Sequence, residues 1–315
     1  MSPCVLITGG SGFLGRASAR IFKSAGWYVV GIGRSRWSTR EAAEVGYNHW
    51  TNSALSLGAL TALNIKPNAV VHCAGSGSVS FSHNLPLNAF DDTVASIAEL
   101  LDYLRLHSPT STFIYPSSAA VYGAAPDQPL VETDLPNPVS LYGYHKLMAE
   151  SLLAAYTRTF CQPTIAIRFF SIYGPGLRKQ LLWDASQRFL GGTSPQIFWG
   201  TGDETRDWIH VDDAARLILY LAENPISAGE PSTLRVLNGA SGNRLTVRDV
   251  LNRLALALDS KLTFSFNGIV RPGDPRFYHA DTKQLLLTGW RPTVDFHQGL
   301  ESYASWVRAS NHANF

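Results

Sequence analysis

Short apolar runs that alternate with helix-forming stretches restrict the fold of this chain more than any other feature of its sequence. The runs are almost continuously apolar and rich in β-branched residues, as expected for strands that helices cover on both faces. They span Cys4–Thr8, Tyr28–Ile32, Ala69–Cys73, Thr112–Pro116 and Thr164–Phe169. The helical patterns between them span Phe13–Ala25, Leu55–Leu63, Asp91–Leu106 and Tyr142–Arg158. This alternation predicts βαβ units, and hence a doubly wound parallel sheet of the α/β class.

After Ile172 the alternation becomes weaker. The remaining strand candidates surround Ile197, Ile209 and Leu234. The remaining helix candidates span Asp212–Ala222, Val247–Leu258 and Phe296–Val307. A chain of 315 residues is longer than a typical single domain. We therefore expect a main α/β domain over residues 1–171 and a smaller C-terminal α/β lobe over residues 172–315, from which the chain can cross back to the main sheet.

The composition narrows the classes of partner. Apolar residues make up 45% of the chain and charged residues 16%, which suits a buried core, and the net charge is +2. A charge so close to neutrality gives no reason to expect nucleic acid or an anionic membrane as a partner. The apolar stretches fall short of the roughly 20 residues that span a bilayer. Met1 is followed at once by the run Cys4–Thr8, without the basic flank of a signal peptide, so we expect a cytoplasmic protein.

Cysteine and histidine provide no metal-binding pattern. Cys4, Cys73 and Cys161 are odd in number and scattered, which predicts buried, reduced thiols rather than disulfides. The histidines considered as ligands are His72, His83, His145 and His210. Their spacing does not suit metal ligation. We interpret them as structural or cofactor-adjacent residues and expect no metal.

A glycine-rich loop directly follows the first apolar run. Gly9, Gly12 and Gly15 have the spacing G-x-x-G-x-x-G, and a helical pattern begins at Phe13. Glycines let such a turn bring backbone N–H groups onto a pyrophosphate at the helix N-terminus. The plainer alternative is a strand-to-helix turn that binds nothing, but the position of the loop favours a dinucleotide site in a Rossmann-type fold. We expect Phe13 and Leu14 to contact the cofactor together with the three glycines.

The end of the second predicted strand bears on which dinucleotide is bound. An NAD site places a carboxylate there, about 20 residues past the loop, for the ribose hydroxyls. Here Gly33 occupies that place and is followed by Arg34, Ser35 and Arg36. A guanidinium suits a 2′-phosphate, which a carboxylate would repel. The alternative is that both arginines are ordinary solvated charges, and we predict NADP in preference to NAD.

Three polar residues suggest acid–base chemistry. Tyr142 and Lys146 are four residues apart at the start of a helical pattern, so they share one helix face. A tyrosine hydroxyl has a pKa near 10, and a nearby ammonium, with a cationic nicotinamide ring, brings that pKa toward neutrality. Such a pair alone is as readily two ordinary helix residues. Ser118 supports the functional interpretation, because it follows Thr112–Pro116 at a strand end, where open α/β sheets bind ligands.

Taken together, these motifs resemble the NAD-dependent epimerase/dehydratase family, the extended short-chain dehydrogenases. The resemblance rests on the glycine loop, His72–Gly75, Ser118–Gly123 and Tyr142–Lys146. It continues at Arg168–Phe170, Tyr173–Pro175, Gly202–Asp203, Arg206–Asp213, Arg271–Asp274, Asp281 and Gly289–Pro292. It therefore covers essentially the whole chain.

The resemblance implies an enzyme in which Ser118, Tyr142 and Lys146 are catalytic and the C-terminal lobe holds a nucleotide-diphosphate sugar. Arg206 and Arg271 would bind the diphosphate, for which guanidinium groups are well suited. The expected cofactor contacts beyond the glycine loop are Gly33, Arg34, Arg36, Cys73, Ala74, Gly75, Thr93, Tyr142, Lys146 and Phe169. The expected substrate contacts are Ser82, Ser118, Ala119, Ser171, Arg206, Arg271 and Asp274.

Two further implications concern single features. Arg168 is as well explained by buried support of the fold as by ligand contact. The helices Asp91–Leu106 and Tyr142–Arg158 resemble those that pair into a four-helix dimer interface in the family, which implies a homodimer. The alternative is that both helices pack only on their own sheet.

The sequence departs from the family pattern at four positions. Thr93 and Ser171 stand where the family usually has Asn, and because they are shorter and lack an amide N–H, we expect rearranged contacts to nicotinamide or diphosphate. Ala119 and Ala120 stand where the family's 4,6-dehydratases carry Asp-Glu, and decarboxylating relatives also keep an acid there. Alanine moves no proton, so dehydration and decarboxylation are disfavoured.

Two reactions of carbohydrate biosynthesis remain. A 4-ketoreductase transfers hydride from NADPH to a keto sugar, whereas a 4-epimerase oxidises C4 and reduces it again with a cofactor that stays bound. Gly33 and Arg34 tilt the prediction slightly toward NADPH and the reductase. A third hypothesis is a non-catalytic protein that only binds the cofactor, since fold alone does not dictate function. The intact set of Ser118, Tyr142 and Lys146 argues against it.

Overall fold

The chain forms two compact units in the computed structural model, which describes residues 2–75, 77–124, 126–225, 233–269 and 275–312. The first unit comprises Met1–Gly123, Leu135–Phe169 and Ala214–Asn238. The second comprises Ala124–Asp134, Phe170–Asp213 and Gly239–Phe315. Each unit is therefore assembled from separate stretches of the sequence.

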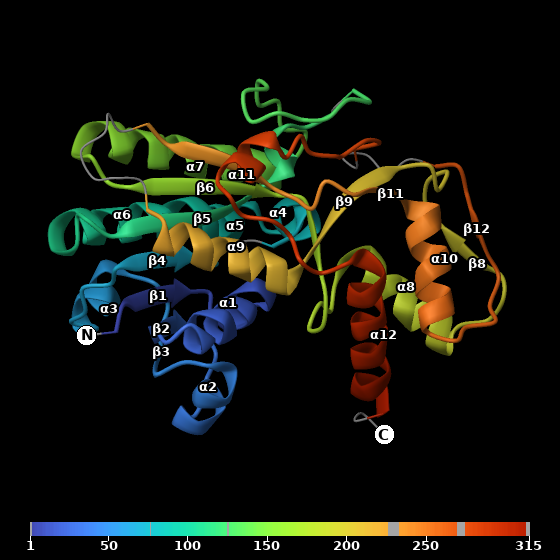
Figure 1. Cartoon of the computed structure of the whole chain (residues 1–315), viewed down its shortest axis with the longest axis horizontal. Helices are drawn as coiled ribbons and strands as arrows, with labels where there is room; N and C mark the ends of the chain where they lie inside the picture. Colours follow the sequence, from blue (N-terminus) through green and yellow to red (C-terminus); the bar gives the residue numbers. More distant parts are fainter. Residues whose placement is uncertain (1, 76, 125, 226–232, 270–274, 313–315) are drawn as a thin grey trace. The chain divides into compact units, whose positions relative to one another are not determined.

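A seven-stranded sheet in the order β10-β6-β5-β4-β1-β2-β3 forms the centre of the first unit (Figure 1). Its strands are β1 (Cys4–Thr8), β2 (Tyr28–Gly33), β3 (His49–Asn52), β4 (Ala69–His72), β5 (Thr112–Ser118), β6 (Thr164–Phe169) and β10 (Arg235–Gly239). The pairings from β3 through β2, β1, β4 and β5 to β6 are parallel. The strand order reverses at β1, between β2 and β4, which is where doubly wound sheets bind their ligands. The predicted Rossmann-type fold is confirmed.

Helices cover both faces of this sheet. They are α1 (Phe13–Ser24), α2 (Thr39–Val45), α3 (Leu57–Ala62), α4 (Val79–Asn84), α5 (Pro86–Phe90), the π-helical turn η1 (Asp91–Ala95), α6 (Ser96–His107), the 3₁₀ turn η2 (Ala119–Val121), α7 (Leu141–Phe160) and α9 (Val211–Glu223). On one face α3, α6 and α7 bury Leu60, Leu101 and Leu153 against Leu6 and Phe113. The helix α1 and most of α9 lie on the other face (Figure 1). Removing this apolar surface from water is the main source of stability for such a layered unit.

The second unit contains two small sheets. The strands β7 (Ser171–Tyr173), β9 (Thr205–His210) and β11 (Arg244–Thr246) form one sheet in the order β11-β9-β7, and β8 (Gln196–Phe198) pairs with β12 (Phe264–Phe266) in the other. The helices are α8 (Gln180–Gly191), α10 (Val247–Ala257), α11 (Lys283–Leu287) and α12 (Phe296–His312). The rings of Phe189, Phe198 and Phe264 lie 5.7–5.8 Å apart between centroids, so aromatic packing forms part of this core.

Several predicted elements need correction. The sequence groups the strand around Leu234 with the smaller lobe, from which it lets the chain cross back, and β10 pairs with β6 at the edge of the main sheet. The helix expected over Asp91–Leu106 begins as the π-helical turn η1. The elements absent from the prediction are β3, β7, β11, β12, α2, α4, α5, α8 and α11. Most of these are too short to show a hydrophobic period.

The cysteines are free thiols, as predicted, but only Cys4 and Cys73 are largely enclosed. Cys4 and Cys73 are partly exposed, and Cys161, which ends α7 with a left-handed backbone, is exposed. Within the described residues, none of the helices is long and apolar enough to cross a membrane.

Candidate active site

The glycine loop is packed tightly against the end of β4. Gly9 has a φ of +62°, and a Cβ atom placed on it would lie 2.4 Å from the backbone nitrogen of Ala74. A Cβ atom on Gly15 would lie 2.7 Å from the carbonyl oxygen of Gly9. Only glycine fits both places, so the predicted turn and its contact with the strand end Cys73–Gly75 depend on each other.

The amino terminus of α1 is suited to an anion. Its N-cap residue is Gly12, which provides no side-chain cap for the first-turn amides. Uncapped amides at a helix N-terminus attract phosphate groups, because the helix dipole adds to their hydrogen-bonding capacity. Phe13 and Leu14 lie in this first turn. The loop thus fits the pyrophosphate of a dinucleotide.

Tyr47, which the sequence did not single out, supports the loop through hydrogen bonds. Its buried hydroxyl donates to the carbonyl oxygens of Gly10 (2.9 Å) and Gly15 (3.3 Å). A Cβ atom on Gly31, in the middle of β2, would lie 2.5 Å from the Tyr47 ring. An isolated glycine inside a strand often marks a close approach of another group, so Gly31 was the feature of the sequence that could have indicated a bulky neighbour such as Tyr47.

The end of β2 carries the residues predicted to select NADP. Arg34 is largely exposed and forms an ion pair with Asp92 of η1, at 3.2 Å. Arg36 is exposed, and Gly33 lies against Trp50 of β3. The guanidinium expected to bind a 2′-phosphate therefore already has a carboxylate partner, which the sequence did not indicate.

The three predicted catalytic residues lie together in the first unit. Ser118 ends β5, while Tyr142 and Lys146 lie in the first turns of α7. The side chain of Ser118 is near enough to that of Tyr142 to lower the pKa of the tyrosine. The Lys146 ammonium donates to the Pro116 carbonyl at 2.9 Å and lies 4.6 Å from the centre of the Tyr115 ring and 5.8 Å from that of Tyr142.

The protonation behaviour of the site differs from the prediction. Burial raises the pKa of Tyr142, and the nearby Ser118 side chain partly opposes this shift. The sequence predicts that Lys146 lowers this pKa, but Ser118 is the group that lowers it here, and burial outweighs that effect. Burial, with help from Lys146, lowers the pKa of His72 to about 3, and burial raises the pKa of Cys73 to about 12. Both groups at the end of β4 are therefore neutral near pH 7.

The other predicted contacts of the first unit lie in β6, η2, α4 and η1. Thr93 is buried on η1, and a Cβ atom on Gly75 would lie 3.2 Å from its hydroxyl oxygen. A π-helical turn such as η1 frequently marks a functional site. Three positions remain. Phe169 is paired in register with Ser118, and Ala119 is buried in η2. Ser82 is buried in α4, with its hydroxyl 3.3 Å from the Ser78 carbonyl oxygen.

The predicted substrate residues of the second unit are described only in part. Ser171 begins β7, and Arg206 lies in β9, the strand next to it. Arg206 donates to the Thr205 carbonyl at 2.8 Å, and its guanidinium lies 5.8 Å from the centre of the Tyr278 ring. The other two predicted residues, Arg271 and Asp274, lie outside the described residues. The assignment of a diphosphate to the two arginines stays a prediction.

Known proteins resemble the chain over almost its whole length. The model of the NAD dependent epimerase/dehydratase family matches residues 5–236. UDP-glucuronate 4-epimerase 3 of Arabidopsis thaliana is 27% identical over 96% of this chain and 76% of its own length. UDP-glucose 4-epimerase of Azospirillum brasilense is 29% identical, with 98% and 93% covered.

Solved structures share the fold. UDP-glucuronic acid 4-epimerase from Bacillus cereus, in complex with UDP-glucuronic acid and NAD, superposes with a TM-score of 0.86 at 24% identity, covering 98% of this chain and 99% of the other. MoeE5 in complex with UDP-glucuronic acid and NAD gives a TM-score of 0.84 at 27% identity, with 97% and 99% covered.

The fold, the grouping of Ser118, Tyr142 and Lys146, and the family match together define an enzyme with a nicotinamide dinucleotide site. The chain belongs to the NAD dependent epimerase/dehydratase family, as its motifs indicated. Three of the four proteins described above carry the name of a UDP-sugar 4-epimerase.

Proposed function

We propose that this enzyme is a nucleotide-sugar 4-epimerase with a nicotinamide dinucleotide as its cofactor. The observation that carries the proposal is the grouping of Ser118, Tyr142 and Lys146 at the end of β5 and the start of α7, in the unit that also holds the glycine loop. Ala119 and Ala120 follow the serine, so the position that is acidic in dehydratases provides no proton carrier. The resemblance to UDP-sugar 4-epimerases supports the same reaction and a UDP-sugar as substrate.

The mechanism follows from the chemistry of the three side chains. A bound nicotinamide would supply the chemistry of reversible hydride transfer, by which C4 is oxidised and then reduced on its opposite face. Tyr142 takes the proton of the C4 hydroxyl as general base and gives it back as general acid. Ser118, whose side chain acts on the pKa of Tyr142, holds the oxygen that loses and regains this proton. Lys146 is oriented by the Pro116 carbonyl and stabilises the phenolate form through its charge.

The relatives favour epimerisation over the net ketoreduction that the sequence alone favours. That preference rests on Arg34 as an NADPH determinant. The ion pair between Arg34 and Asp92 weakens this argument, because the carboxylate partly neutralises the guanidinium. The neighbours solved with NAD favour the same interpretation.

One assay separates the two reactions. The purified enzyme is incubated with UDP-glucuronic acid, UDP-glucose and UDP-N-acetylglucosamine, each in turn, and the products are identified by NMR. We expect a C4 epimer to form from one of them, with no net change in absorbance at the NADPH band. A parallel incubation contains NADPH and a nucleotide-bound 4-keto sugar. Stoichiometric consumption of NADPH in it, with no epimer in the first incubation, would establish the reductase instead.

The tyrosine variant provides the control. Tyr142→Phe removes only the hydroxyl, so cofactor binding should persist while turnover falls by about 10²–10⁴-fold, the usual contribution of a general acid–base group. Ser118→Ala should lower turnover by a smaller factor, because the serine orients the oxygen without carrying the proton. Unchanged turnover in Tyr142→Phe would exclude the mechanism.

The assembly and location of the enzyme are also proposals. The side chains of Leu141, Tyr144 and Met148 on α7 are 44–46% exposed, which gives this helix a partly apolar outer surface. We infer that α6 and α7 pair with their copies in a homodimer through a four-helix bundle. A cytoplasmic location and a role in carbohydrate biosynthesis agree with a nucleotide-sugar substrate.

A further inference from the structure

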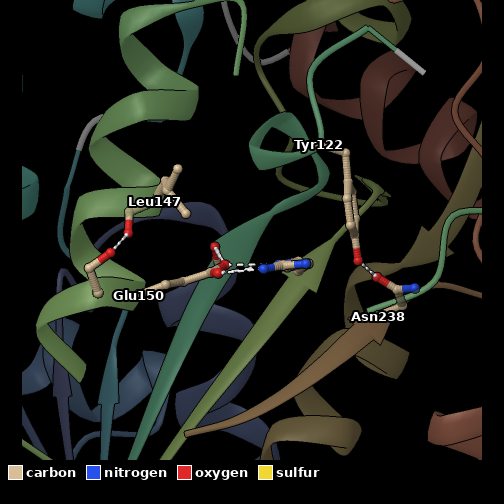
Figure 2. A network of polar contacts seen from close by, with 7 residues as sticks. Tyr122, Leu147, Glu150 and Asn238 are labelled. Carbon is tan, nitrogen blue, oxygen red and sulfur yellow. Dashed lines mark hydrogen bonds and ion pairs between the residues drawn. The ribbon is translucent and has the colours of Figure 1, made fainter. Parts of the chain in front are cut away.

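A buried ion pair lies one helical turn beyond Lys146. Glu150 of α7 and Arg168 of β6 each have a side chain that is 5% exposed. The Arg168 Nη2 atom donates to Glu150 Oε2 at 2.8 Å, and its Nε atom donates to the two carboxylate oxygens at 3.1 and 3.3 Å. Figure 2 shows Glu150 extending from α7 to this contact. Burial lowers the pKa of Arg168, but Glu150 outweighs this effect and keeps the pKa above its ordinary value.

The pair is joined to the strand that ends in the catalytic serine. The Ser117 hydroxyl donates to Glu150 Oε1 at 2.6 Å, and Ser117 is paired in register with Arg168. Lys146, one turn earlier on α7, donates to the carbonyl of Pro116. Two successive turns of α7 therefore bind two successive residues of β5, directly before Ser118.

The contacts continue beyond Ser118. The Arg168 guanidinium lies 4.7 Å from the centre of the Tyr122 ring, at the end of η2. The Tyr122 hydroxyl donates to the side-chain oxygen of the buried Asn238 at 2.6 Å (Figure 2). The segment that begins at Ser118 is thus held before and after the serine by groups connected to Arg168.

We propose that Glu150 and Arg168 are positioning residues for the epimerase reaction, which hold Ser118 against Tyr142 while Arg168 neutralises the buried carboxylate beside Lys146. The proposal rests on the proposed function. It assigns the pair two separable tasks. The first is to fix the position of the end of β5. The second is to keep the Glu150 carboxylate neutralised, so that Lys146 is the net charge that acts on Tyr142.

The charged and titratable groups around Tyr142 make the second task measurable. They are Lys146 on α7, Tyr115 and Ser118 on β5, and, beyond Lys146, the neutral His72 and Cys73 at the end of β4. Burial raises the pKa of Tyr115 well above its usual value, and both Tyr142 and Glu150 raise it further, so the charge of Glu150 reaches this part of the site. An uncompensated carboxylate there disfavours a phenolate, whereas an uncompensated guanidinium favours it.

The test uses Arg168→Gln, Glu150→Gln and the double variant. Ionisation of Tyr142 is followed on the purified protein by tyrosinate absorbance, as the difference between each protein and its Tyr142→Phe counterpart. We expect the Tyr142 pKa to rise by about one unit in Arg168→Gln, to fall in Glu150→Gln, and to return close to the wild-type value in the double variant. Shifts of the same sign in the two single variants, or none, would overturn the proposal.

Kinetics test the first task. In Arg168→Gln we expect kcat to fall by about tenfold or more while KM for the nucleotide sugar changes much less, because orientation rather than binding is lost. Ser117→Ala removes only one hydrogen bond from Glu150 and leaves the charges balanced. It should lower kcat by a few-fold without moving the Tyr142 titration, and it keeps the test open if the charge variants fold poorly. An unchanged kcat in Ser117→Ala would contradict the positioning role.

The two proposals can fail separately. The titration needs no substrate, so an inactive wild type would refute the epimerase function and leave the titration to decide the role of the pair. Conversely, if the enzyme is an active epimerase but the Tyr142 pKa is the same in the wild type, Arg168→Gln and Glu150→Gln, the positioning proposal alone is refuted.

Discussion

Arg34 and Asp92 bear on how the enzyme chooses between two dinucleotides. The pair is partly solvated, and exposed pairs of this kind contribute only about 0.2–1 kcal/mol. Asp92→Asn frees Arg34 and should raise the affinity for NADP(H) relative to NAD(H) by at most about fivefold. Arg34→Asp should lower the same ratio by about tenfold or more, because a carboxylate repels the 2′-phosphate. Calorimetric titration with both dinucleotides measures this ratio.

The direction of the Asp92→Asn effect is the sensitive part of this prediction. If Arg34 does not contact the dinucleotide, the ratio stays the same in both variants. A ratio that falls in Asp92→Asn would mean that the carboxylate is not competing for the guanidinium.

The catalytic residues could be predicted from the sequence, but the ion pair behind them could not. Ser118, Tyr142 and Lys146 could be selected because each stands in a short motif at a strand end or helix start. Glu150 follows Lys146 by four residues, and the same helical spacing would have placed it on the catalytic face. Its pairing with Arg168 could not be foreseen, since it depends on how α7 packs against the register of β5 and β6.

At the scale of elements, Tyr47 ties the turn before β3 to the glycine loop. Tyr47→Phe leaves two buried carbonyl oxygens without this donor, at a cost of about 1–3 kcal/mol. We expect a several-fold rise in the dissociation constant of the dinucleotide, while kcat at saturating cofactor stays near that of the wild type. Tyr28→Phe is the matched control, because Tyr28 is 45% exposed at the start of β2. Equal effects of the two substitutions would remove the special role of Tyr47.

In the second unit Asp207 links β9 to the turn that follows Gly239. It is fully buried and accepts from the amides of Ser241 (2.9 Å) and Gly242 (3.1 Å). Burial raises its pKa to about 6 from 3.8, although these bonds lower it. Between these values the folded protein holds a proton that the unfolded chain has released, so this group makes the free energy of unfolding fall as the pH rises.

Asp207→Asn makes this dependence visible. Asparagine does not titrate, so the free energy of unfolding of the wild type minus that of the variant should be larger near pH 4 than near pH 7, by at most about 3 kcal/mol. Denaturant titrations at several pH values measure it. Asp203→Asn, at a side chain that is 67% exposed, should give a difference that changes little with pH. A difference that grows with rising pH would mean that the hydrogen bonds outweigh burial.

For the whole molecule, the proposed dimer can be tested on α7. Met148→Glu places a charge on the partly apolar outer face of this helix, where burial in an interface would be costly. We expect the wild type to sediment as a dimer and the variant as a monomer. Leu256→Glu, at a side chain on α10 that is 76% exposed, is the control and should remain dimeric. A monomeric wild type would exclude the assembly.

The overall fold was predictable because its signal repeats along the chain. Five nearly continuous apolar runs gave the strands β1, β2, β4, β5 and β6 to within one or two residues. The edge strand β3 was harder, because its end residues His49 and Asn52 are exposed and it lacks an apolar run. Local sequence also cannot say which sheet a short strand joins, and for this reason the strand near Leu234 could not be assigned to the main sheet from the sequence.

The position of β10 has a consequence for how the protein is made. β6 ends at Phe169 and its edge partner β10 begins at Arg235. Ribosomes add residues in order, at about 5–20 per second, so the nascent sheet waits roughly 3–13 s with the edge of β6 unpaired. During that interval the growing chain carries an open strand edge of the kind that recruits other chains. The need for chaperones should therefore peak before residue 235 is added and fall after it.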